Sequence, residues 1–456
     1  MTVNYALYSG VSGLGSTSEG MSVISNNIAN STTKGFKHDR AEFEDMLSVS
    51  INELSQMGRG SRLRNTTTLF TQGAVTTTGA ITDLAVQGDG FFIVEAQSDS
   101  ILESNGHYYT RMGSFRFDKN GKLTDPVGNR VQGFMADEKG RLSSHLSDVE
   151  IISNSIPPRA TTLMNVIANL DVREKPPTDD FNIEKPRETS NYMTTVTIYD
   201  NYGYGRECDI YFKRTGDDSK NEWEWYATVD GFDISKNPDI GPDGKPVKAI
   251  IGKGTVEFDE DGKPILPYVN KKGQKTYIDT AEQNDVFEVQ FSNGAKPQKI
   301  QFNFGPQIDE DGNLGSQTST SIAAPSNLSF TSQNGYEYGF LKTMKIELNG
   351  TVNGIYTNGL ERRLGAVALA TFPNNQGLQK IGGNNFIRTP LAGSPQVGMA
   401  QSSSRGSIYS SSLEESNVDL ARQFVEMITT QRGFQANSKS ITTADQMLGE
   451  IIDLKR

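Results

Sequence analysis

The sequence predicts a multidomain, mainly β fold in which paired N- and C-terminal α-helices, packed like a coiled coil, enclose nested β domains inserted between them. Three observations predict it. Apolar residues recur every seven positions near both ends of the chain, which is the spacing of a helical seam. The middle of the chain alternates apolar and polar residues between Asp–Gly turns, as β-hairpins do. A length of 456 residues allows about two to four compact domains.

Residues 1–32 are expected to form the first helix. Its apolar seam consists of Leu7, Val11, Leu14, Met21, Ile24 and Ile28. Glycines lie inside this segment at positions 10, 13, 15 and 20, and each costs about 0.8–1 kcal/mol relative to alanine in a helix interior. We therefore expect this helix to be marginal alone and to form mainly when it is packed.

The second helix is expected within residues 414–456, and its seam is stronger. The apolar residues of this seam are Leu413, Leu420, Phe424, Met427, Phe434, Ile441, Leu448 and Ile452, and Ile428 and Ile451 widen its face. Ser416 followed by Asp419 resembles a capping box, which predicts a helix start near Asn417. Polar side chains interrupt the seam at Gln431 and Asn437, where they can fix the register or the partner of a helix pair. A helical hairpin within one monomer and a surface for packing other copies both fit this pattern.

The middle of the chain is expected to be β structure divided into nested domains. Repeated Asp–Gly turns are expected at 118–121, 137–140, 259–262 and 309–312. Prolines and polar residues over 157–190 indicate the entry to a second β domain. The predicted domains are a helical domain (1–32 and 414–456), a linker region (33–70 and 400–413), a first β domain (71–157 and 331–399) and an outer inserted β domain (158–330).

Composition excludes several functional classes. The chain has 55 acidic and 44 basic residues and a formal net charge of -11, so we expect no nucleic-acid partner. No apolar run approaches the ~18 residues of a membrane-spanning helix, so no membrane insertion is expected. Cys208 is the one cysteine, which excludes an intramolecular disulfide framework and a cysteine-rich metal site. The N-terminus also lacks the basic and apolar regions of a cleavable signal peptide.

The sequence contains no constellation of catalytic residues. His38, His107 and His145 are far apart and lie in no ligand-spaced motif, and P-loop, dinucleotide-binding and zincin motifs are absent. The turn at 259–262 fits part of an EF-hand loop, but Tyr268 stands where a calcium-binding glutamate is needed. We therefore predict no enzyme activity, no cofactor and no metal site. Trp223 and Trp225 share one face of a strand, where core packing is favoured over a surface ligand-binding module.

Both ends of the chain carry long runs of a specific sequence signature. The N-terminal runs are Tyr8–Leu14, Ile24–Asn30 and Lys34–Lys37, and the C-terminal runs are Ser416–Leu420 and Gln431–Lys439. The residues that match these motifs are Asn26, Asn27, Asn30, Gly35, Phe36, Asn417, Asp419, Gln431, Arg432, Gly433 and Asn437. These runs resemble the terminal signatures of bacterial flagellar axial proteins, which rod, hook and hook–filament junction proteins share. Long matches at both ends are specific.

The interior resembles the hook members of this family. The matching runs are Leu84–Phe92, Thr110–Phe115, Asn169–Asp171, Val196–Asp200, Tyr356–Gly359 and Leu364–Phe372. Rod proteins of the family lack a large outer insertion, whereas this chain inserts about 170 residues. The resemblance therefore implies a structural subunit of the flagellar hook, with a distal rod-type subunit as the alternative.

The resemblance also implies how such a subunit works. Many copies would assemble into a helical homopolymer, a curved tube that acts as a flexible joint and transmits torque from rod to filament around a central export channel. The seam residues of both helices would pack in the inner wall, and the insertion would face outward. The implied partners are rod, hook cap and hook–filament junction proteins and the flagellar type III export apparatus. The implied location is the basal body and hook of the flagellum, outside the cytoplasm, either extracellular or, in some bacteria, periplasmic.

Overall fold

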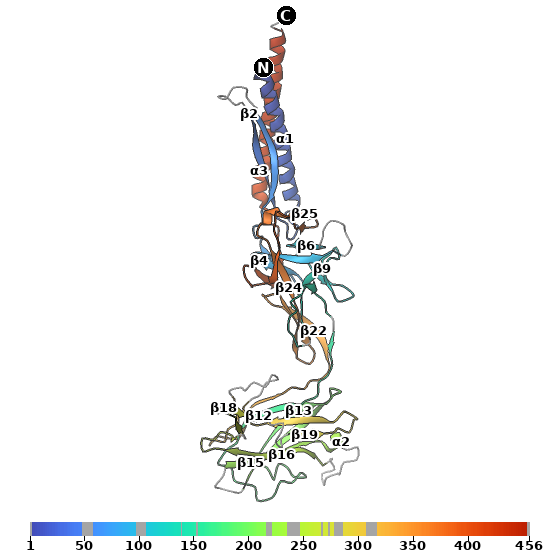
Figure 1. Ribbon diagram of the computed structural model, residues 1–456, viewed down its shortest axis with the longest axis vertical. Coiled ribbons are helices and arrows are strands. Elements are labelled where there is room, and N and C mark those ends of the chain that lie inside the picture. The colour runs from blue at the N-terminus through green and yellow to red at the C-terminus, as the bar shows by residue number, and fades with distance from the viewer. Residues whose placement is uncertain are drawn as a thin grey trace. The chain divides into compact units, whose positions relative to one another are not determined.

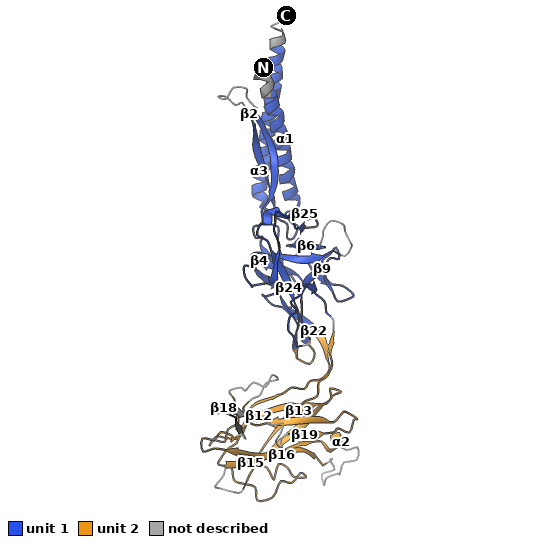
Figure 2. Cartoon of the chain, in the orientation of Figure 1, with its two compact units in different colours: residues 1–153, 342–355, 361–456 blue, residues 154–341, 356–360 orange. Residues whose placement is uncertain are grey.

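The computed structural model of the chain describes residues 2–47, 58–96, 106–137, 139–151, 154–215, 221–234, 247–265, 268–271, 274–277, 286–306 and 317–453. The fold is mainly β with a helix near each terminus, so the predicted fold class is confirmed (Figure 1). The chain divides into two compact units, which are shown in Figure 2. Unit 1 comprises residues 1–153, 342–355 and 361–456, and unit 2 comprises 154–341 and 356–360. No helix in the described ranges is long and apolar enough to cross a membrane.

The two long helices of unit 1 are α1 (Thr2–Ala29) and α3 (Leu420–Asp453), and they lie side by side (Figure 1). The second helix begins three residues after the predicted start, because Asp419 is its N-cap. The Asp419 Oδ1 accepts hydrogen bonds from the backbone N–H of Ala421 at 2.9 Å and of Arg422 at 3.2 Å. The Ser416 hydroxyl accepts only from Val418 N, at 3.4 Å, outside the helix. The predicted capping box at Ser416 is therefore wrong.

A β-hairpin occupies most of the segment predicted as a linker. Strands β1 (Asp39–Leu47) and β2 (Gly58–Thr68) pair antiparallel and pack against α1. The Ser61 and Ser16 hydroxyls lie 2.8 Å apart across this contact. A Cβ on Gly60 would lie 1.7 Å from Ser12 Oγ, so the hairpin backbone touches the helix directly. The described residues of the segment 33–70 are thus mainly strand structure, which corrects the prediction of a linker region.

The rest of unit 1 is a β body built around one central strand. Its elements are β3 (Val75–Thr77), β4 (Leu84–Gln87), β5 (Phe91–Glu95), β6 (His107–Thr110), β7 (Arg116–Phe117), β8 (Leu123–Thr124), β9 (Arg130–Met135), β10 (Ser147–Asp148), β23 (Thr351–Tyr356), β24 (Glu361–Thr371), η2 (Asn375–Gly377), β25 (Gln379–Gly382), β26 (Asn385–Ile387), β27 (Gln396–Met399), β28 (Ser407–Ser410) and β29 (Ser412–Glu414). Strand β24 pairs with β5, β9, β23 and β27.

Strand β24 separates two hydrophobic cores, because successive side chains of a strand point to opposite faces. Val367 and Leu369 join one cluster with Phe92, whereas Ala368 and Ala370 join the other. Strands β28 and β29 pair with β4 and β3, so the second half of the segment 400–413, predicted as linker, is strand structure of this body.

Unit 2 is built from two four-stranded sheets around one core. The first sheet is β13 (Tyr192–Tyr199), β14 (Gly205–Arg214), β15 (Asn221–Val229) and β16 (Ala249–Phe258), and the second is β19 (Val286–Val289), β20 (Gln298–Asn303), β12 (Leu163–Asn169) and β21 (Asn327–Gln333). The remaining elements are α2 (Gly231–Ile234), β17 (Tyr268–Lys271), β18 (Gln274–Tyr277), β11 (Ser155–Ile156) and β22 (Gly339–Ile346), of which β22 ends in unit 1. Because β21 pairs with β12, unit 2 continues past the predicted boundary at residue 330.

The core of unit 2 holds both tryptophans, as core packing predicts. Trp223 and Trp225 are fully buried, and the Trp225 ring lies 4.8 Å from the ring of Phe304 and 5.1 Å from that of Phe302. Cys208 is buried beside them. Burial raises the pKa of the Cys208 thiol to about 12, so it stays protonated and unreactive at neutral pH.

The Asp–Gly turns form where the structure describes them. In the turn at 118–121, Asp118 Oδ1 accepts from the backbone N–H of Asn120 and Lys122, and Gly121 takes a φ of 80°. In the turns at 137–140 and 259–262, the Oδ1 atoms of Asp137 and Asp259 likewise accept from a backbone N–H four residues later, and the glycines have positive φ. The predicted turn at 309–312 lies outside the described residues.

Candidate functional site: the helix pair and its polar junction

The contact between α1 and α3 depends on small residues of α1. A Cβ on Gly10 would lie 2.7 Å from Ile441 Cγ1, and one on Gly13 would lie 2.6 Å from Asn437 Nδ2. These glycines therefore allow the two helices to approach closely. Gly15, in contrast, has no heavy atom within 4 Å of its ideal Cβ position. The polar interruption at Asn437 thus faces a glycine rather than an apolar partner.

In a single chain, some residues of the predicted apolar seam are buried or half-buried and others are exposed to solvent. Residues that are buried or half-buried include Leu7, Leu14, Met21, Ile24 and Ile28 of α1 and Met427, Ile441 and Leu448 of α3. Val11 is 59% exposed, and Leu420, Phe424 and Phe434 are 43%, 45% and 42% exposed. Leu413 is buried but lies in strand β29 and not in the helix, because Glu414 and Leu413 pair with β3. Ile452 belongs to α3, with its side chain outside the described part.

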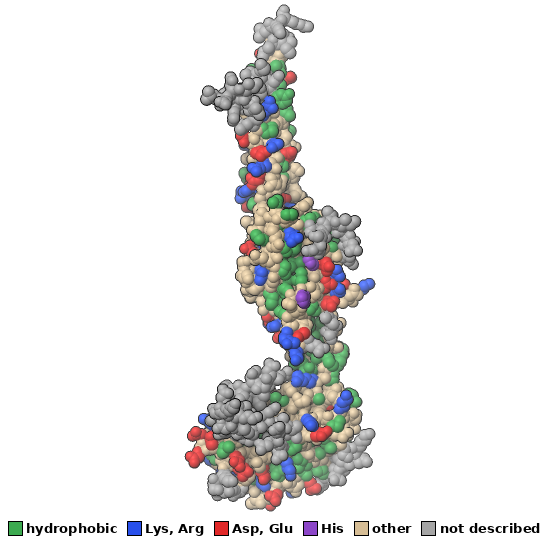
Figure 3. All heavy atoms as spheres, in the orientation of Figure 1, with side chains coloured by type: hydrophobic (Ala, Val, Ile, Leu, Met, Phe, Trp, Pro, Cys, Tyr) green, Lys and Arg blue, Asp and Glu red, His purple; other side chains and the backbone are tan. Residues whose placement is uncertain are grey.

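Other apolar side chains add to this exposed surface. Tyr8, Val425 and Ile428 are 69%, 62% and 48% exposed. In Figure 3, apolar side chains reach the visible surface along the helical part of unit 1. Large apolar groups left in water are unfavourable for an isolated chain and mark an interaction surface.

The motif asparagine Asn27 connects α1, the hairpin and α3. Its side chain is almost completely buried. Its Nδ2 donates to the Asp39 carbonyl at 2.7 Å and to Gln423 Oε1 at 3.1 Å, while its Oδ1 accepts from Asp39 N at 2.9 Å. The start of β1 and the first turns of α3 are therefore positioned by one side chain. Asn30 Nδ2 donates to the Asn26 carbonyl at 3.0 Å, just after the last turn of α1.

Gly35 and Phe36 follow at the base of the helix pair. Gly35 has a φ of 70°, and its N–H donates to the Glu414 carbonyl at 2.8 Å. A Cβ at this position would lie 2.8 Å from the Arg111 carbonyl carbon, so only glycine fits. Phe36 is buried, and Lys380 Nζ lies 5.0 Å from the centre of its ring. This glycine lets the chain pass closely between the helix and the β body.

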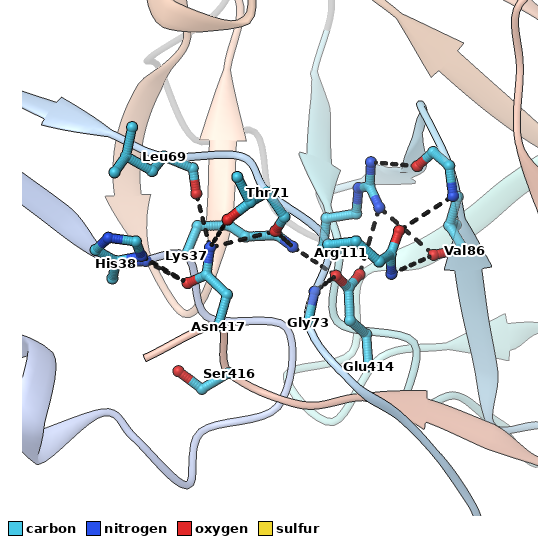
Figure 4. A network of polar contacts seen from close by, with 12 residues as sticks. Lys37, His38, Leu69, Thr71, Gly73, Val86, Arg111, Glu414, Ser416 and Asn417 are labelled. Carbon is cyan, nitrogen blue, oxygen red and sulfur yellow. Dashed lines mark hydrogen bonds and ion pairs between the residues drawn. The ribbon is translucent and has the colours of Figure 1, made fainter. Parts of the chain in front are cut away.

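Asn417 joins three segments ahead of α3 (Figure 4). Its Oδ1 accepts from the backbone N–H of His38 at 2.8 Å. Its Nδ2 donates to the Leu69 carbonyl and to Thr71 Oγ1, both at 2.9 Å. The chain before β1, the chain after β2 and the approach to α3 therefore meet at one amide.

The sequence reasoning missed a buried ionic cluster at the same junction, formed by Lys37, Arg111 and Glu414 (Figure 4). Glu414 Oε1 accepts from Lys37 Nζ at 2.5 Å and from Gly73 N at 2.9 Å, and Oε2 lies 3.4 Å from Arg111 Nη1. Lys37 Nζ also donates to the Thr71 carbonyl at 2.7 Å, and Arg111 Nη2 to the Gly88 carbonyl at 2.8 Å.

These three charged side chains are shielded from water, with exposed fractions of 0% for Lys37 and Glu414 and 4% for Arg111. Burial lowers the pKa of Lys37, although the Glu414 carboxylate acts in the opposite direction. Burial lowers the pKa of Arg111 in the same way. The only sequence signal for this cluster was the presence of Lys37 and Arg111 within the runs that carry the family resemblance.

The remaining motif residues lie along α3. Asp419 caps the helix, while Gly433 and Asn437 face α1. Gln431 and Arg432 are exposed. Across the described ranges, no three His, Cys, Asp or Glu side chains are placed to hold a metal ion. The site is therefore a packing surface with a polar junction, and its chemistry is that of association.

Comparison with known proteins assigns the family. Four family models match: "Flagella basal body rod protein" at residues 7–37, "Flagellar hook protein FlgE/F/G D1 domain" at 85–170, "Flagellar basal body protein FlaE D2 domain" at 169–336 and "Flagellar basal body rod FlgEFG protein C-terminal" at 409–454. The chain is 35% identical to flagellar hook protein FlgE of Borreliella burgdorferi and 32% identical to that of Treponema pallidum, with 99% of each chain covered. The chain belongs to the flagellar hook protein family.

More distant hook proteins agree with this assignment. The hook protein FlgE of Escherichia coli is 31% identical, with 98% of both chains covered. The crystal structure of Helicobacter pylori flagellar hook protein FlgE2 matches with a TM-score of 0.50 at 16% identity, covering 74% of this chain and 100% of that chain, which shows a shared fold. This hook-family chain is thus a structural hook subunit and not an enzyme. It self-polymerises within the hook and basal body of the flagellum, and the distal rod alternative is not favoured.

Proposed function

We propose that α1, α3 and the β1–β2 hairpin form the self-association surface of the hook subunit. The exposed apolar side chains of the helix pair carry this proposal, since one chain leaves Phe424, Val425 and Val11 in water. Neighbouring copies in a tube supply the missing apolar contacts. Burial of apolar surface stabilises association by roughly 25 cal/mol per Å², so these contacts favour the polymer over the monomer.

The subunit is proposed to contribute different layers to a curved tube. The helical domain, residues 1–32 and 414–456, forms the inner wall around an export channel. The first β domain and the linker regions continue outward from it, and the inserted domain faces outward. The contacts of the inserted domain are polar and hydrated, because wet interfaces rearrange with small changes in free energy. A tube with a firm inner layer and sliding outer contacts bends while it rotates, as a torque-transmitting joint must.

The proposed partners follow from this position in the flagellum. Copies leave the cytoplasm through the flagellar type III export apparatus and add to the tube beneath a hook cap. The rod and the hook–filament junction proteins contact its two ends. The mature polymer is extracellular, or periplasmic in some bacteria.

The experiment that tests the self-association surface is the substitution Leu420→Asp. A carboxylate in an apolar interface carries a large desolvation cost, so polymerisation in a precipitating salt should fall at least tenfold. Electron microscopy and sedimentation measure the polymer. The matched control is Leu391→Asp, because Leu391 is 79% exposed on the β body of the same unit. Wild-type polymerisation of Leu420→Asp, or an equal loss in both variants, contradicts the proposal.

A further inference from the structure

A groove in unit 1 lies between α1, the β1–β2 hairpin and α3, and it is called here the hairpin groove. Its volume is about 850 Å³. Val23, Ile24, Phe43 and Leu69 form its apolar lining. Phe43 is 48% exposed, so part of this lining is open to solvent in a single chain. Figure 1 shows α1, β2 and α3 running alongside one another here.

The charged groups around the groove are already paired. Arg422 Nε donates to Glu426 Oε1 at 3.0 Å, and both residues line the α3 wall. Asp39 accepts from Lys380 Nζ at 2.6 Å. When an apolar side chain fills the groove, it therefore buries no unpaired charge, and the large desolvation cost of such a charge is avoided.

A matching apolar ridge lies on α3 itself, and it is called here the α3 stripe. Leu420, Phe424 and Ile428 repeat at intervals of four residues and are 43%, 45% and 48% exposed. At 1.5 Å per residue the stripe is ~12 Å long. The α3 wall of the groove runs from Arg422 to Gly433, a length of ~17 Å by the same rise per residue, so the groove is long enough to hold the stripe.

The stripe and the groove lie on opposite sides of α3. Each residue of an α-helix advances by about 100°. Taking Leu420 as the reference, the stripe is centred near ~40°, whereas the groove residues Glu426 and Thr429 lie near ~240° and ~180°. The two surfaces are thus about 170° apart around one helix. A single chain cannot bring them together, but two neighbouring copies can.

We propose that the α3 stripe of one copy seats in the hairpin groove of the next copy. This inference rests on the proposed self-association of the helical part. Because the two surfaces differ, the contact is heterologous: each copy keeps one free groove and one free stripe after binding a neighbour. Such a contact continues from copy to copy instead of closing into a dimer, which is the geometry that a helical tube requires.

The test is disulfide trapping between two single-cysteine variants in a Cys208→Ser background. One variant is Phe424→Cys in the stripe, and the other is Ala41→Cys, which lines the groove. The variants are mixed, polymerised and oxidised, since a disulfide forms only where two Cα atoms come within about 7 Å. We expect a cross-linked dimer in polymer and at least tenfold less in dilute monomer. Far-UV circular dichroism confirms that each variant folds.

The matched control is Val425→Cys mixed with Ala41→Cys. Val425 is exposed on the same helix but is turned about 100° from Phe424. If polymers form but Phe424→Cys is not cross-linked to Ala41→Cys more than Val425→Cys is, the proposed contact between stripe and groove is wrong. The proposed self-association surface is not contradicted by that result. Preferential trapping of Tyr8→Cys by Ala41→Cys also overturns the proposed contact, because the occupant is then α1. Failure of the native chain to polymerise counts against both the pairing and the proposed function.

Discussion

At the scale of single residues, the junction of the hook subunit contains a charge cluster that is almost completely shielded from water. Glu414 lies between two cations, Lys37 and Arg111. Each ion loses its hydration, and hydrogen bonds to backbone carbonyls and to Gly73 N replace part of it. Such a cluster adds little net stability compared with apolar groups, but removal of one member is costly because its partners stay buried and charged.

Glu414→Gln should destabilise unit 1 by about 3–5 kcal/mol, because two buried cations lose their counter-charge. The unfolding of unit 1 is followed by far-UV circular dichroism in urea. Since both tryptophans of the chain lie in unit 2, tryptophan fluorescence should report an unchanged transition. The control is Glu415→Gln, whose partner Lys34 is partly exposed, and it should cost about 0–1 kcal/mol. Equal costs for both variants would show that the buried cluster is not special.

The pH dependence of that defect has a definite sign. Burial already lowers the pKa of Lys37 in the native chain, and loss of Glu414 removes a contribution that raises this pKa. The unfolded state of the variant then binds more protons than the folded state, so stability rises with pH as Lys37 loses its proton. The deficit of Glu414→Gln should therefore shrink between neutral and alkaline pH, and a deficit that stays constant argues against a charged Lys37 as its cause.

In unit 2, Asp200 is a buried carboxylate like Glu414, and it accepts hydrogen bonds from the backbone N–H of Tyr202 and Tyr204 in the turn that follows β13. Its side chain is fully buried and accepts from Arg206 Nη1 at 2.8 Å and Asn293 Nδ2 at 2.6 Å. Burial by itself raises the pKa of Asp200, but Arg206, Asn293 and the N–H groups of Tyr204 and Tyr202 together outweigh it and lower this pKa. The folded-state pKa is thus below the unfolded one, and the stabilisation is present above roughly pH 4.

Unit 2 should accordingly lose stability as pH falls below about 4, when Asp200 takes up a proton. Asp200→Asn should lower stability at pH 6 and reduce the additional loss between pH 4 and pH 2, because this carboxylate no longer titrates. Tryptophan fluorescence in urea measures both effects. Asp261→Asn, at an exposed turn position, serves as the control and should leave the acid-dependent loss unchanged. An identical acid dependence in the Asp200 variant and the wild type would refute this assignment.

At the scale of elements, glycines in α1 lower its intrinsic helix stability but allow α1 and α3 to pack closely. Gly10 and Gly13 weaken α1, yet their missing side chains leave room for Ile441 and Asn437 of α3. Gly15 has no such neighbour. The glycines of one helix therefore differ in role, and only their surroundings distinguish them.

Alanine substitutions should separate these two roles. Gly15→Ala should stabilise the helix pair by about 0.5–1 kcal/mol, because alanine has the higher helix propensity and meets no atom. Gly10→Ala should destabilise it by about 1–3 kcal/mol, since the new methyl overlaps Ile441. The thermal midpoint of the circular dichroism signal at 222 nm should move in opposite directions. Midpoints that rise together would mean that α1 and α3 do not pack through Gly10.

At the scale of the whole molecule, the helix pair is the part that a single chain leaves incompletely buried. The β body and unit 2 each enclose closed apolar clusters, whereas the helices expose a row of apolar groups. Local opening is easiest where few apolar contacts hold an element. The ends of the chain should therefore open readily in the monomer and become protected when neighbours cover them.

Limited proteolysis should show this difference. In the monomer, chymotrypsin should cut within α1 (Thr2–Ala29) and α3 (Leu420–Asp453) within minutes and leave a fragment that retains both tryptophans. In the polymer, the same sites should be cleaved at least tenfold more slowly. Mass spectrometry of the fragments locates the cuts, and tryptophan fluorescence confirms that unit 2 stays folded. Equal protection of the ends in both states contradicts the proposed role of the helices.

The sequence by itself determined the class of the fold, the positions of the two long helices and the family. Seven-residue periodicity and Asp–Gly turns are local patterns, and local backbone geometry follows from them. The core position of Trp223 and Trp225 was predictable for the same reason, since alternate residues of a strand share one face.

Only the tertiary structure decided which apolar residues meet a partner within the chain. Met427 and Phe424 belong to the same periodic pattern, yet Met427 is half-buried and Phe424 is exposed to solvent. It also decided that Leu413 lies in a strand, that Asp419 caps α3, and that Lys37, Arg111 and Glu414 converge. The cap at Asp419 is local, but Leu413 and Glu414 contact residues hundreds of positions away. No local periodicity encodes those contacts, and they exist only when the chain has brought its two ends together.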